Sequence, residues 1–418
     1  MGQSFFWKSR HTTLAVLFGT WLVSYADRMV MATAIPYIAT DFNLTPVAMG
    51  VVMSAFFVGY ATCQLPGGFL ADKFGARKVM FGAILIWSLF TVFTGLAGSL
   101  ASMLWIRVVF GIGEGVFPAA SFKSLSNWFP KKERGTATGI MMASNPLGAA
   151  IAPLIVAGMV AAWGWRSAFI GLLLPGLVLC YLIWRLVPDR PADKKGISRE
   201  ELAEIQDEPA LEQTGEVAKV SFWEVVKVPT VTKCFFMLFF FNTAAWGFVS
   251  WLPSYLVKVR GFEILKMGIT ASLPFFVGTI GFALGGWLND KFRHNPKIPL
   301  LTCQLSCSLF LYLMYTAEST NLLILYQTLA GGFLYTAGGV IFALPMSSIP
   351  SGITGRAMGF INTAGQGAGF FSPIIMGYLV QTSGGSFNIA FAFLIVTMLT
   401  SAVIATTIKS RKAAISTQ

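Results

Sequence analysis

The sequence places an acid beside a base, at Asp27-Arg28, in the middle of its first long apolar stretch. An ionised side chain at the centre of a bilayer costs about 2.5–3.5 kcal/mol on insertion scales, so charges at that depth indicate a functional site. Arg28 keeps its charge and can hold a carboxylate through two parallel hydrogen bonds, which suits an organic anion. Because neighbouring residues point about 100° apart on a helix, we expect Arg28 to face a cavity and Asp27 to reach toward another helix.

A second acid lies in the fourth apolar stretch. Glu114 follows Arg107 by seven residues, so the two side chains share one face of a helix. A buried carboxyl beside a cation can exchange a proton near neutral pH, which is what proton coupling requires. The alternative role for Glu114 is a structural ion pair. Of the eighteen acids, only Asp27 and Glu114 fall inside the predicted spanning stretches.

The composition predicts an all-α membrane protein. Hydrophobic residues make up 55% of the 418 residues and charged residues 11%, against about 25% charged residues in a soluble domain. Stretches long enough to span a bilayer, about 20 residues each, occur at 12–37, 47–70, 79–97, 101–124, 136–160, 166–187, 231–257, 268–288, 298–316, 322–346, 356–380 and 387–408. We therefore predict six helices in 1–187, a polar linker in 188–230 and six helices in 231–418.

The charge of +12 is distributed as in a membrane protein. Most Lys and Arg residues fall in alternate loops or at the termini, the positive-inside pattern that places both termini in the cytoplasm. We expect a lipid bilayer as the surroundings, and no nucleic-acid partner. The first apolar stretch is too long for a signal peptide and lacks a small-residue cleavage site, so we expect it to stay as the first spanning helix.

The linker and the cysteines complete this picture. A short helix is predicted near 198–205, where Ser198 and Glu201 have the spacing of a capping box. The five cysteines lie in or at the edge of apolar stretches, as small packing residues do. They predict no disulfide framework and no metal site. Lys123 closes the fourth stretch, and we expect its ammonium group to extend to the lipid headgroups.

The two halves of the chain repeat. Residues 56–74 read FFVGYATCQLPGGFLADKF, and residues 275–292 read FFVGTIGFALGGWLNDKF. Both copies end the second spanning stretch of their half. Repeats of this kind place a binding site near the membrane midplane between the halves, and rocking of the halves gives alternating access.

The loop after the second stretch carries a motif in Gly68, Asp72, Lys73, Gly75, Arg77 and Lys78. It resembles the signature loop of the major facilitator superfamily, which implies two pseudo-symmetric bundles of six helices. Asp72 lies at a helix C-terminus, where a carboxylate needs a cation or a facing helix N-terminus. A pairing of that kind would gate the cytoplasmic side. The alternative is a basic turn that only sets topology.

Further motifs resemble the anion:cation symporter family, which includes bacterial sugar-acid/H⁺ symporters. They are Tyr25-x-Asp27-Arg28, Cys63-Gln64-Leu65-Pro66-Gly67-Gly68, Arg107 with Gly111-x-x-Glu114, Phe117-Pro118, and Trp128-Phe129-Pro130-x-x-Glu133-Arg134. This resemblance implies that Arg28 binds the substrate carboxylate. It implies that Asp27 and Glu114 gain and lose protons in the cycle, and that Arg107 modulates these acids.

The resemblance also implies substrate contacts outside these charges. They are Tyr25, Tyr60, Trp246 and Asn362. Asn145 stands where the sugar-acid carriers often have Gln, which leaves the substrate open. Gln366, in a glycine-rich part of the eleventh stretch, could also face the cavity.

These observations predict a proton-coupled importer of a small organic anion, such as a sugar acid, in the bacterial inner membrane. The alternatives are a carrier of a bulkier or aromatic acid or a siderophore, an exchanger or exporter, and a non-transporting sensor. The common hydrolase, metalloprotease and phosphate-loop motifs are absent from the sequence, so we expect no enzyme. We expect no cofactor besides the coupled proton, and a monomer.

Overall fold

The computed structural model describes residues 7–206, 222–292, 294–349 and 353–408. Within these ranges every regular element is a helix, and eleven helical segments are long and apolar enough to cross a membrane. The 29-residue helix α15 (Thr354–Thr382) completes the set. The structure therefore confirms the predicted all-α fold of twelve spanning helices.

The first six spans come from seven helices. They are α1 (Ser9–Asp41), α2 (Pro46–Phe74), α3 (Ala76–Gly95), α4 (Leu100–Trp128), α5 (Lys131–Trp163), and one span built from α6 (Trp165–Gly171) and α7 (Leu173–Leu186). The spans extend a few residues beyond the apolar stretches because polar residues continue the helices past the apolar core. Gly75, with φ of 89°, ends α2 in a backbone conformation that favours glycine.

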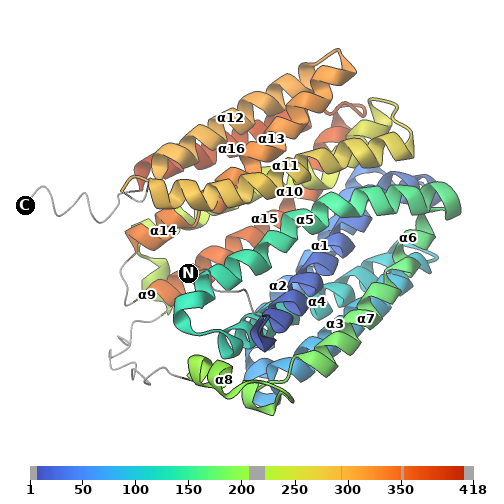
Figure 1. Cartoon of the computed structure of the whole chain (residues 1–418). Helices are drawn as coiled ribbons and strands as arrows, with labels where there is room; N and C mark the ends of the chain where they lie inside the picture. Colours follow the sequence, from blue (N-terminus) through green and yellow to red (C-terminus); the bar gives the residue numbers. More distant parts are fainter. Residues whose placement is uncertain (1–6, 207–221, 293, 350–352, 409–418) are drawn as a thin grey trace, which may run out of the picture.

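The last six spans follow in the second half of the chain (Figure 1). They are α10 (Pro229–Lys258), α11 (Ile264–Lys291), α12 (Lys297–Thr316), one span built from α13 (Thr320–Val340) and α14 (Ala343–Ser348), then α15, and α16 (Asn388–Thr407). Between the halves lie the 3-10 turn η1 (Pro191–Asp193), α8 (Arg199–Gln206) and α9 (Phe222–Val226). The domain boundaries at 187 and 231 remain a proposal, and residues 207–221 of the linker lie outside the described ranges.

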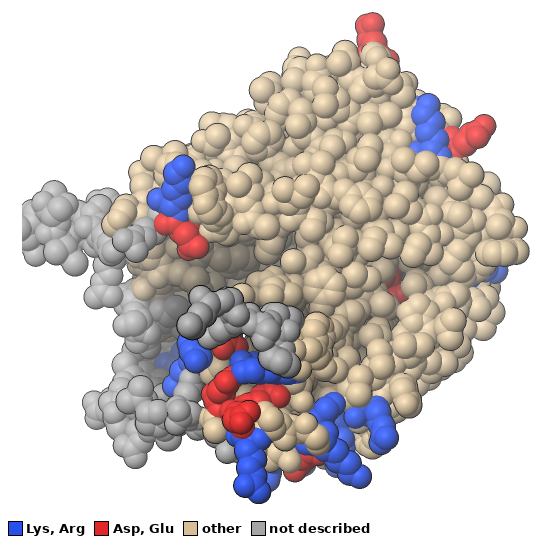
Figure 2. Space-filling view, in the orientation of Figure 1, with Lys and Arg blue, Asp and Glu red and all other residues tan. Residues whose placement is uncertain are grey.

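Charged side chains gather at the ends of the helices (Figure 2). We call the end where α1 begins and α2 ends the basic end, and the other end the opposite end. Between the two ends the flank of the molecule in Figure 2 is almost entirely uncharged. Such a band is what a lipid-facing surface requires, because the hydrocarbon core hydrates no charge.

The two halves meet most closely at the opposite end. Helix α2 packs along α15, and α5 packs along α11. Gly50 of α2 lies against the backbone of Pro373, and Gly268 of α11 lies against the Pro153 carbonyl of α5 so closely that a Cβ atom would collide. Glycine at these crossings allows the backbones to approach.

The same helices separate toward the basic end. A Cβ atom built on Gly139 of α5, Gly286 of α11 or Gly359 of α15 would meet no described atom of a neighbouring element within 4 Å. Figure 2 shows the surface hollowed between the two groups of helices on this side. The structure is therefore closed at the opposite end and open at the basic end.

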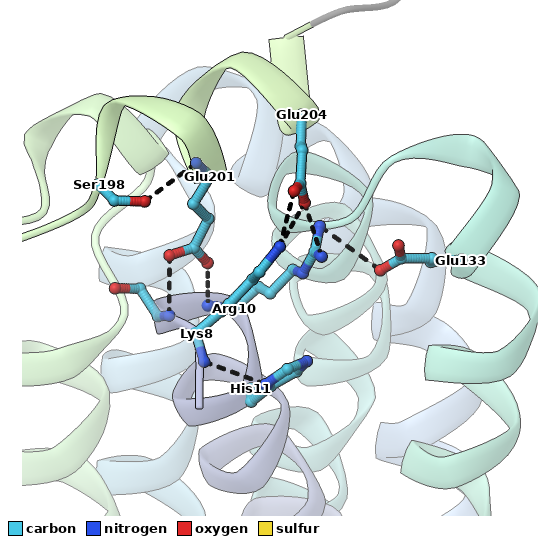
Figure 3. A network of polar contacts seen from close by, with 8 residues as sticks. Lys8, Arg10, His11, Glu133, Ser198, Glu201 and Glu204 are labelled. Carbon is cyan, nitrogen blue, oxygen red and sulfur yellow. Dashed lines mark hydrogen bonds and ion pairs between the residues drawn. The ribbon is translucent and has the colours of Figure 1, made fainter. Parts of the chain in front are cut away.

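The predicted linker helix forms as α8 and docks on the first half (Figure 3). As predicted, the Ser198 hydroxyl caps it by accepting a hydrogen bond from the Glu201 backbone N–H at 3.0 Å. The Glu201 carboxylate, however, accepts hydrogen bonds from the backbone N–H groups of Ser9 and Arg10 at 3.0 and 2.8 Å. It therefore caps α1, whose first N–H groups have no partner within their own helix.

Candidate functional site

Arg28 and Glu114 form an ion pair inside the first half. Arg28 Nε donates to Glu114 Oε2 at 2.6 Å, joining α1 to α4. Only 8% of Arg28 and 1% of Glu114 is exposed. A charged hydrogen bond at such burial is strong, and removing either partner would leave an unpaired charge in the interior.

Aromatic rings enclose both guanidinium groups. The Arg28 Cζ atom lies 4.8, 5.0 and 4.5 Å from the ring centroids of Tyr25, Phe56 and Tyr60. The Arg107 Cζ atom lies 5.6 Å from the same Phe56 ring. Phe56 thus contacts both cations, and the negative face of an aromatic ring stabilises a cation at these distances.

Asp27 and Arg107 complete the group of charges. Asp27 is buried, and its Oδ1 atom has no hydrogen-bond partner among the described residues. Arg107 is 3% exposed, and its Nε atom is likewise unpartnered within the described chain. Asp27 lies within electrostatic range of Glu114, Arg107 and Arg28. The four charges therefore form one cluster, although the sequence spreads them over two helices.

The spacing of Arg107 and Glu114 places the two side chains on one face of α4. They do lie within electrostatic range of each other. The ion pair of Glu114, however, is made with Arg28. Two turns of helix separate Arg107 from Glu114 by about 10 Å along the axis, whereas α1 packs directly beside α4.

A cavity borders this cluster between the two halves. Its lining comes from α1, α2 and α4 of the first half and from α10 of the second, and comprises Arg28, Met29, Met31, Ala32, Met53, Phe56, Phe57, Arg107, Trp246 and Ser250. Trp246 meets Phe57 edge-on, with ring centroids 5.0 Å apart. As expected, Arg28 faces the cavity, while Asp27 is not part of its lining. The guanidinium groups thus lie between the cavity and the buried acids.

Five of the predicted contacts are not part of this lining. The rings of Tyr25 and Tyr60 lie against the Arg28 guanidinium instead. Asn145, Asn362 and Gln366 are not among the described residues that line the cavity. The Asn145 amide lies 3.8 Å from the Met142 sulfur within its own helix. Asn362 is exposed and Gln366 is half-buried. Their predicted role in substrate binding stays a prediction.

Several lining residues are of types that the sequence does not distinguish from ordinary residues of a spanning helix. Phe56, Phe57, Met53 and Ser250 carry no ionisable group, and apolar residues of a spanning helix all look alike in sequence. One signal was available for the two phenylalanines, because they begin the repeated Phe-Phe-Val-Gly segment. The repeat drew attention to these two residues but did not indicate that they line a cavity.

Glycines bring α2 and α4 together at the site. A Cβ atom on Gly111 would collide with the Phe56 carbonyl, and one on Gly115 would collide with the Tyr60 carbonyl. The backbones of the two helices are therefore in contact at the level of the aromatic and charged residues of the site. Small residues permit such a close approach.

A comparison with known families identifies the fold. The family model described as "Major Facilitator Superfamily" matches residues 16–373. This chain belongs to the Major Facilitator Superfamily. Its members are transporters, so the chain is a multi-pass membrane transporter and not an enzyme.

Several relatives within the superfamily cover nearly the whole chain. A probable sulfoacetate transporter of Cupriavidus necator is 35% identical over 92% of this chain and 90% of its own length. A probable galactarate/D-glucarate transporter of Escherichia coli K12 is 32% identical over 92% and 91% of the two chains. A hexuronate transporter of Bacillus subtilis is 29% identical over 92% of each.

Solved structures of the superfamily share the fold at low identity. The partially occluded inward-open xylose transporter XylE of E. coli superposes with a TM-score of 0.76 at 14% identity, over 96% of this chain and 98% of that one. A bacterial homologue of the lysosomal transporter Spinster gives 0.73 at 19% identity, over 97% and 96%. These matches support the twelve-helix architecture.

The superfamily signature loop lies at the basic end. Lys123 Nζ donates to Asp72 Oδ1 at 2.6 Å and to the Ala71 carbonyl at 3.0 Å. The expectation that Lys123 extends to the headgroups stays a prediction. A cation at the C-terminus of α2 offsets both the helix dipole and the Asp72 carboxylate, and α4 supplies that cation from within the first half.

The other residues of the loop also make their contacts with residues of the first half. The Arg77 backbone N–H donates to Asp189 Oδ1 at 2.8 Å, and the Arg77 guanidinium lies 4.7 Å from the Trp184 ring centroid. Lys73 lies 5.3 Å from the Phe74 ring centroid. Lys78 is exposed, and a Cβ atom built on Gly68 would lie 4.0 Å from the Ala119 Cβ atom of α4. With the basic end open, none of these contacts between described residues reaches the second half, and a gating role stays a prediction.

Proposed function

We propose that this protein takes up a small organic anion together with protons, by alternating access through the cavity between its halves. The observation that carries the proposal is the Arg28–Glu114 ion pair beside that cavity. A substrate carboxylate that binds Arg28 competes with Glu114 for the same cation. Glu114 then loses its compensating charge and takes up a proton, because an unpaired carboxylate in the interior is costly. Binding of substrate and proton are coupled in this way.

The class of substrate follows from the guanidinium groups and from the relatives. Arginine holds planar carboxylates through paired hydrogen bonds. The similar transporters described above carry sulfoacetate, hexuronates and aldarates by their names. A carboxylate of comparable size, such as a sugar acid, is the substrate class that we propose for this chain.

We infer the orientation of the protein in its membrane from the charge distribution. The positive-inside rule assigns the basic end, and with it both termini, to the cytoplasm, and the bacterial relatives support a location in the inner membrane. The structure, open at the basic end, then represents an inward-facing state. Proton entry down its gradient would drive uptake.

The decisive experiment uses Glu114→Gln in proteoliposomes given a labelled candidate acid such as galactonate on the outside, with empty vesicles for accumulation and preloaded vesicles for exchange. Glutamine keeps the shape and cannot release a proton. We expect accumulation driven by an inward proton gradient to fall at least tenfold, while exchange of labelled for unlabelled substrate continues. Glu263→Gln, a change at an exposed acid outside the cluster, serves as the control and should accumulate normally. Full gradient-driven accumulation by Glu114→Gln would refute the coupling role.

A further inference from the structure

Two guanidinium groups border one cavity, and only one of them has an anion of its own. Arg28 is paired with Glu114 at 2.6 Å. Arg107 forms no ion pair within 4 Å among the described residues, and its buried Nε atom has no hydrogen-bond partner there. Both Cζ atoms contact the Phe56 ring, at 5.0 and 5.6 Å. A short molecule in the cavity can therefore reach both cations at once.

The charges of the cluster determine what such a molecule must carry. With Asp27 and Glu114 ionised, the two acids balance Arg28 and Arg107, and the empty site is neutral. A doubly charged anion bound to both arginines makes the site neutral only when both acids are protonated. Because uncompensated charge is costly in a low-dielectric interior, each form that crosses between the two open states should be neutral.

We propose that the substrate is a small dianion, held by Arg28 at one acidic group and by Arg107 at the other, and carried with two protons in an electroneutral cycle. This inference rests on the proposed function and deepens it. Arg107 becomes a substrate-binding residue in addition to a neighbour of the acids. A singly charged substrate would balance only one of the two arginines. Either Asp27 or Glu114 would then have to stay ionised, and the substrate would travel with one proton.

The other groups around the cluster are compatible with this assignment. The titratable neighbours are Tyr25 on α1, Tyr60 on α2 and, from α13, Tyr335, which lies within electrostatic range of Tyr25. Phenols stay neutral at physiological pH, so they leave the charge balance unchanged. Apart from the two arginines, the cavity lining is apolar or aromatic with one hydroxyl, that of Ser250. Charge, more than hydroxyl groups, should therefore dominate recognition.

The test compares acids that differ by one negative charge. Galactarate is matched with galactonate, and sulfoacetate with methylsulfonylacetate, in which a methyl group replaces one sulfonate oxygen. The affinities are measured by calorimetric titration of the purified full chain. In the pair that binds better, the dianion should bind about 10- to 100-fold tighter than its monoanionic partner, as expected for a charge-assisted contact. In Arg107→Gln this preference should disappear, with the monoanion affinity nearly unchanged. Arg107→Lys, which keeps the charge, should retain most of the preference.

Proton counting on the unmodified protein gives a readout that needs no variant. In proteoliposomes, a pH dye and labelled substrate should report two protons per dianion, and an imposed membrane potential should not change the uptake rate. Equal affinity of the protein for both members of each pair would overturn the inference, and so would a dianion flux that depends on the membrane potential. Neither result would contradict proton-driven uptake. Absence of proton-driven uptake for all four acids would overturn the proposed function and this inference together.

Discussion

Phe56 contacts both guanidinium groups of the site. Its ring lies at 5.0 Å from the Arg28 guanidinium and 5.6 Å from that of Arg107, and it packs against Tyr60 and Phe110. A desolvated cation–π contact contributes about 1–2 kcal/mol. The ring also keeps water away from one side of each guanidinium, which strengthens any anion contact on the other side.

Replacing Phe56 with Leu tests this role. Leucine fills much of the same space but offers no negative ring face, so we expect substrate affinity to fall about 5- to 30-fold. The measurement is calorimetric titration with the best-bound acid. Phe275→Leu is the matched control, because Phe275 holds the same place in the second copy of the repeat and contacts Tyr335 instead of a cation. Equal losses in both variants would show that the effect is general packing.

At the scale of elements, α8 ties the linker to the first half (Figure 3). Lys8 Nζ donates to both oxygens of Glu204 at 2.7 Å, and Arg10 donates to Glu204 Oε2 at 2.8 Å. Arg10 also lies 3.5 Å from Glu133, near the start of α5. One arginine thereby links α8, α1 and α5 at the basic end, so the three elements should move as one unit.

This network predicts a pH dependence of stability. The hydrogen bond from Lys8, together with the charges of Lys8 and Arg10, lowers the pKa of Glu204. A group whose pKa is depressed on folding stabilises the protein above its unfolded pKa, about 4.3 for Glu, and that stability is lost as pH falls through the folded value. Glu204→Gln should therefore lower the melting temperature at pH 7, and this deficit should shrink as the pH falls below about 4.3 and through the folded pKa of Glu204.

The measurement is thermal unfolding of the detergent-solubilised protein across this pH range. Glu200→Gln is the control, since Glu200 lies on the same helix and is exposed. It should leave the melting temperature unchanged at every pH. A deficit in Glu204→Gln that stays constant down to the lowest pH would argue against the ionic origin of the effect.

At the scale of the whole molecule, the seam between the halves is tight at one end and open at the other. Gly268 meets Ala157 and Pro153 at the opposite end, whereas Gly286, further along the same helix, meets no described neighbour within 4 Å. A bulky residue at Gly268 cannot fit the closed seam. The same residue at Gly286 fits this state and would obstruct closure of the basic end.

Gly268→Trp and Gly286→Trp should therefore both abolish uptake but favour opposite states. Overpacking costs about 1–3 kcal/mol, enough to shift a balanced two-state equilibrium by roughly 5- to 150-fold. Access to the cavity can be read with Ser250→Cys in a chain whose Cys63 is replaced by Ser. A membrane-impermeant thiol reagent should label the Gly286→Trp protein from the basic end and the Gly268→Trp protein from the opposite end. Identical labelling patterns would contradict alternating access through this seam.

The sequence by itself determined the twelve spanning helices and the candidate functional residues. A spanning segment must be apolar over about 20 residues, so hydropathy alone locates it, and each stretch matches an observed span to within a few residues. Acids in such segments are rare because they are costly. Asp27 and Glu114 therefore stood out without any knowledge of their neighbours, as did the capping residue Ser198 of the linker helix.

Only the tertiary structure decided which partners meet. Glu114 pairs with Arg28, Lys123 with Asp72, and Glu201 with the start of α1. Each of these contacts joins residues that lie 50 or more positions apart, so no local periodicity encodes them. They depend on which helices pack side by side and how closely, and at the site that is decided by backbone contact at glycines such as Gly111. Spacing along a chain determines the face of a helix, and packing determines what that face meets.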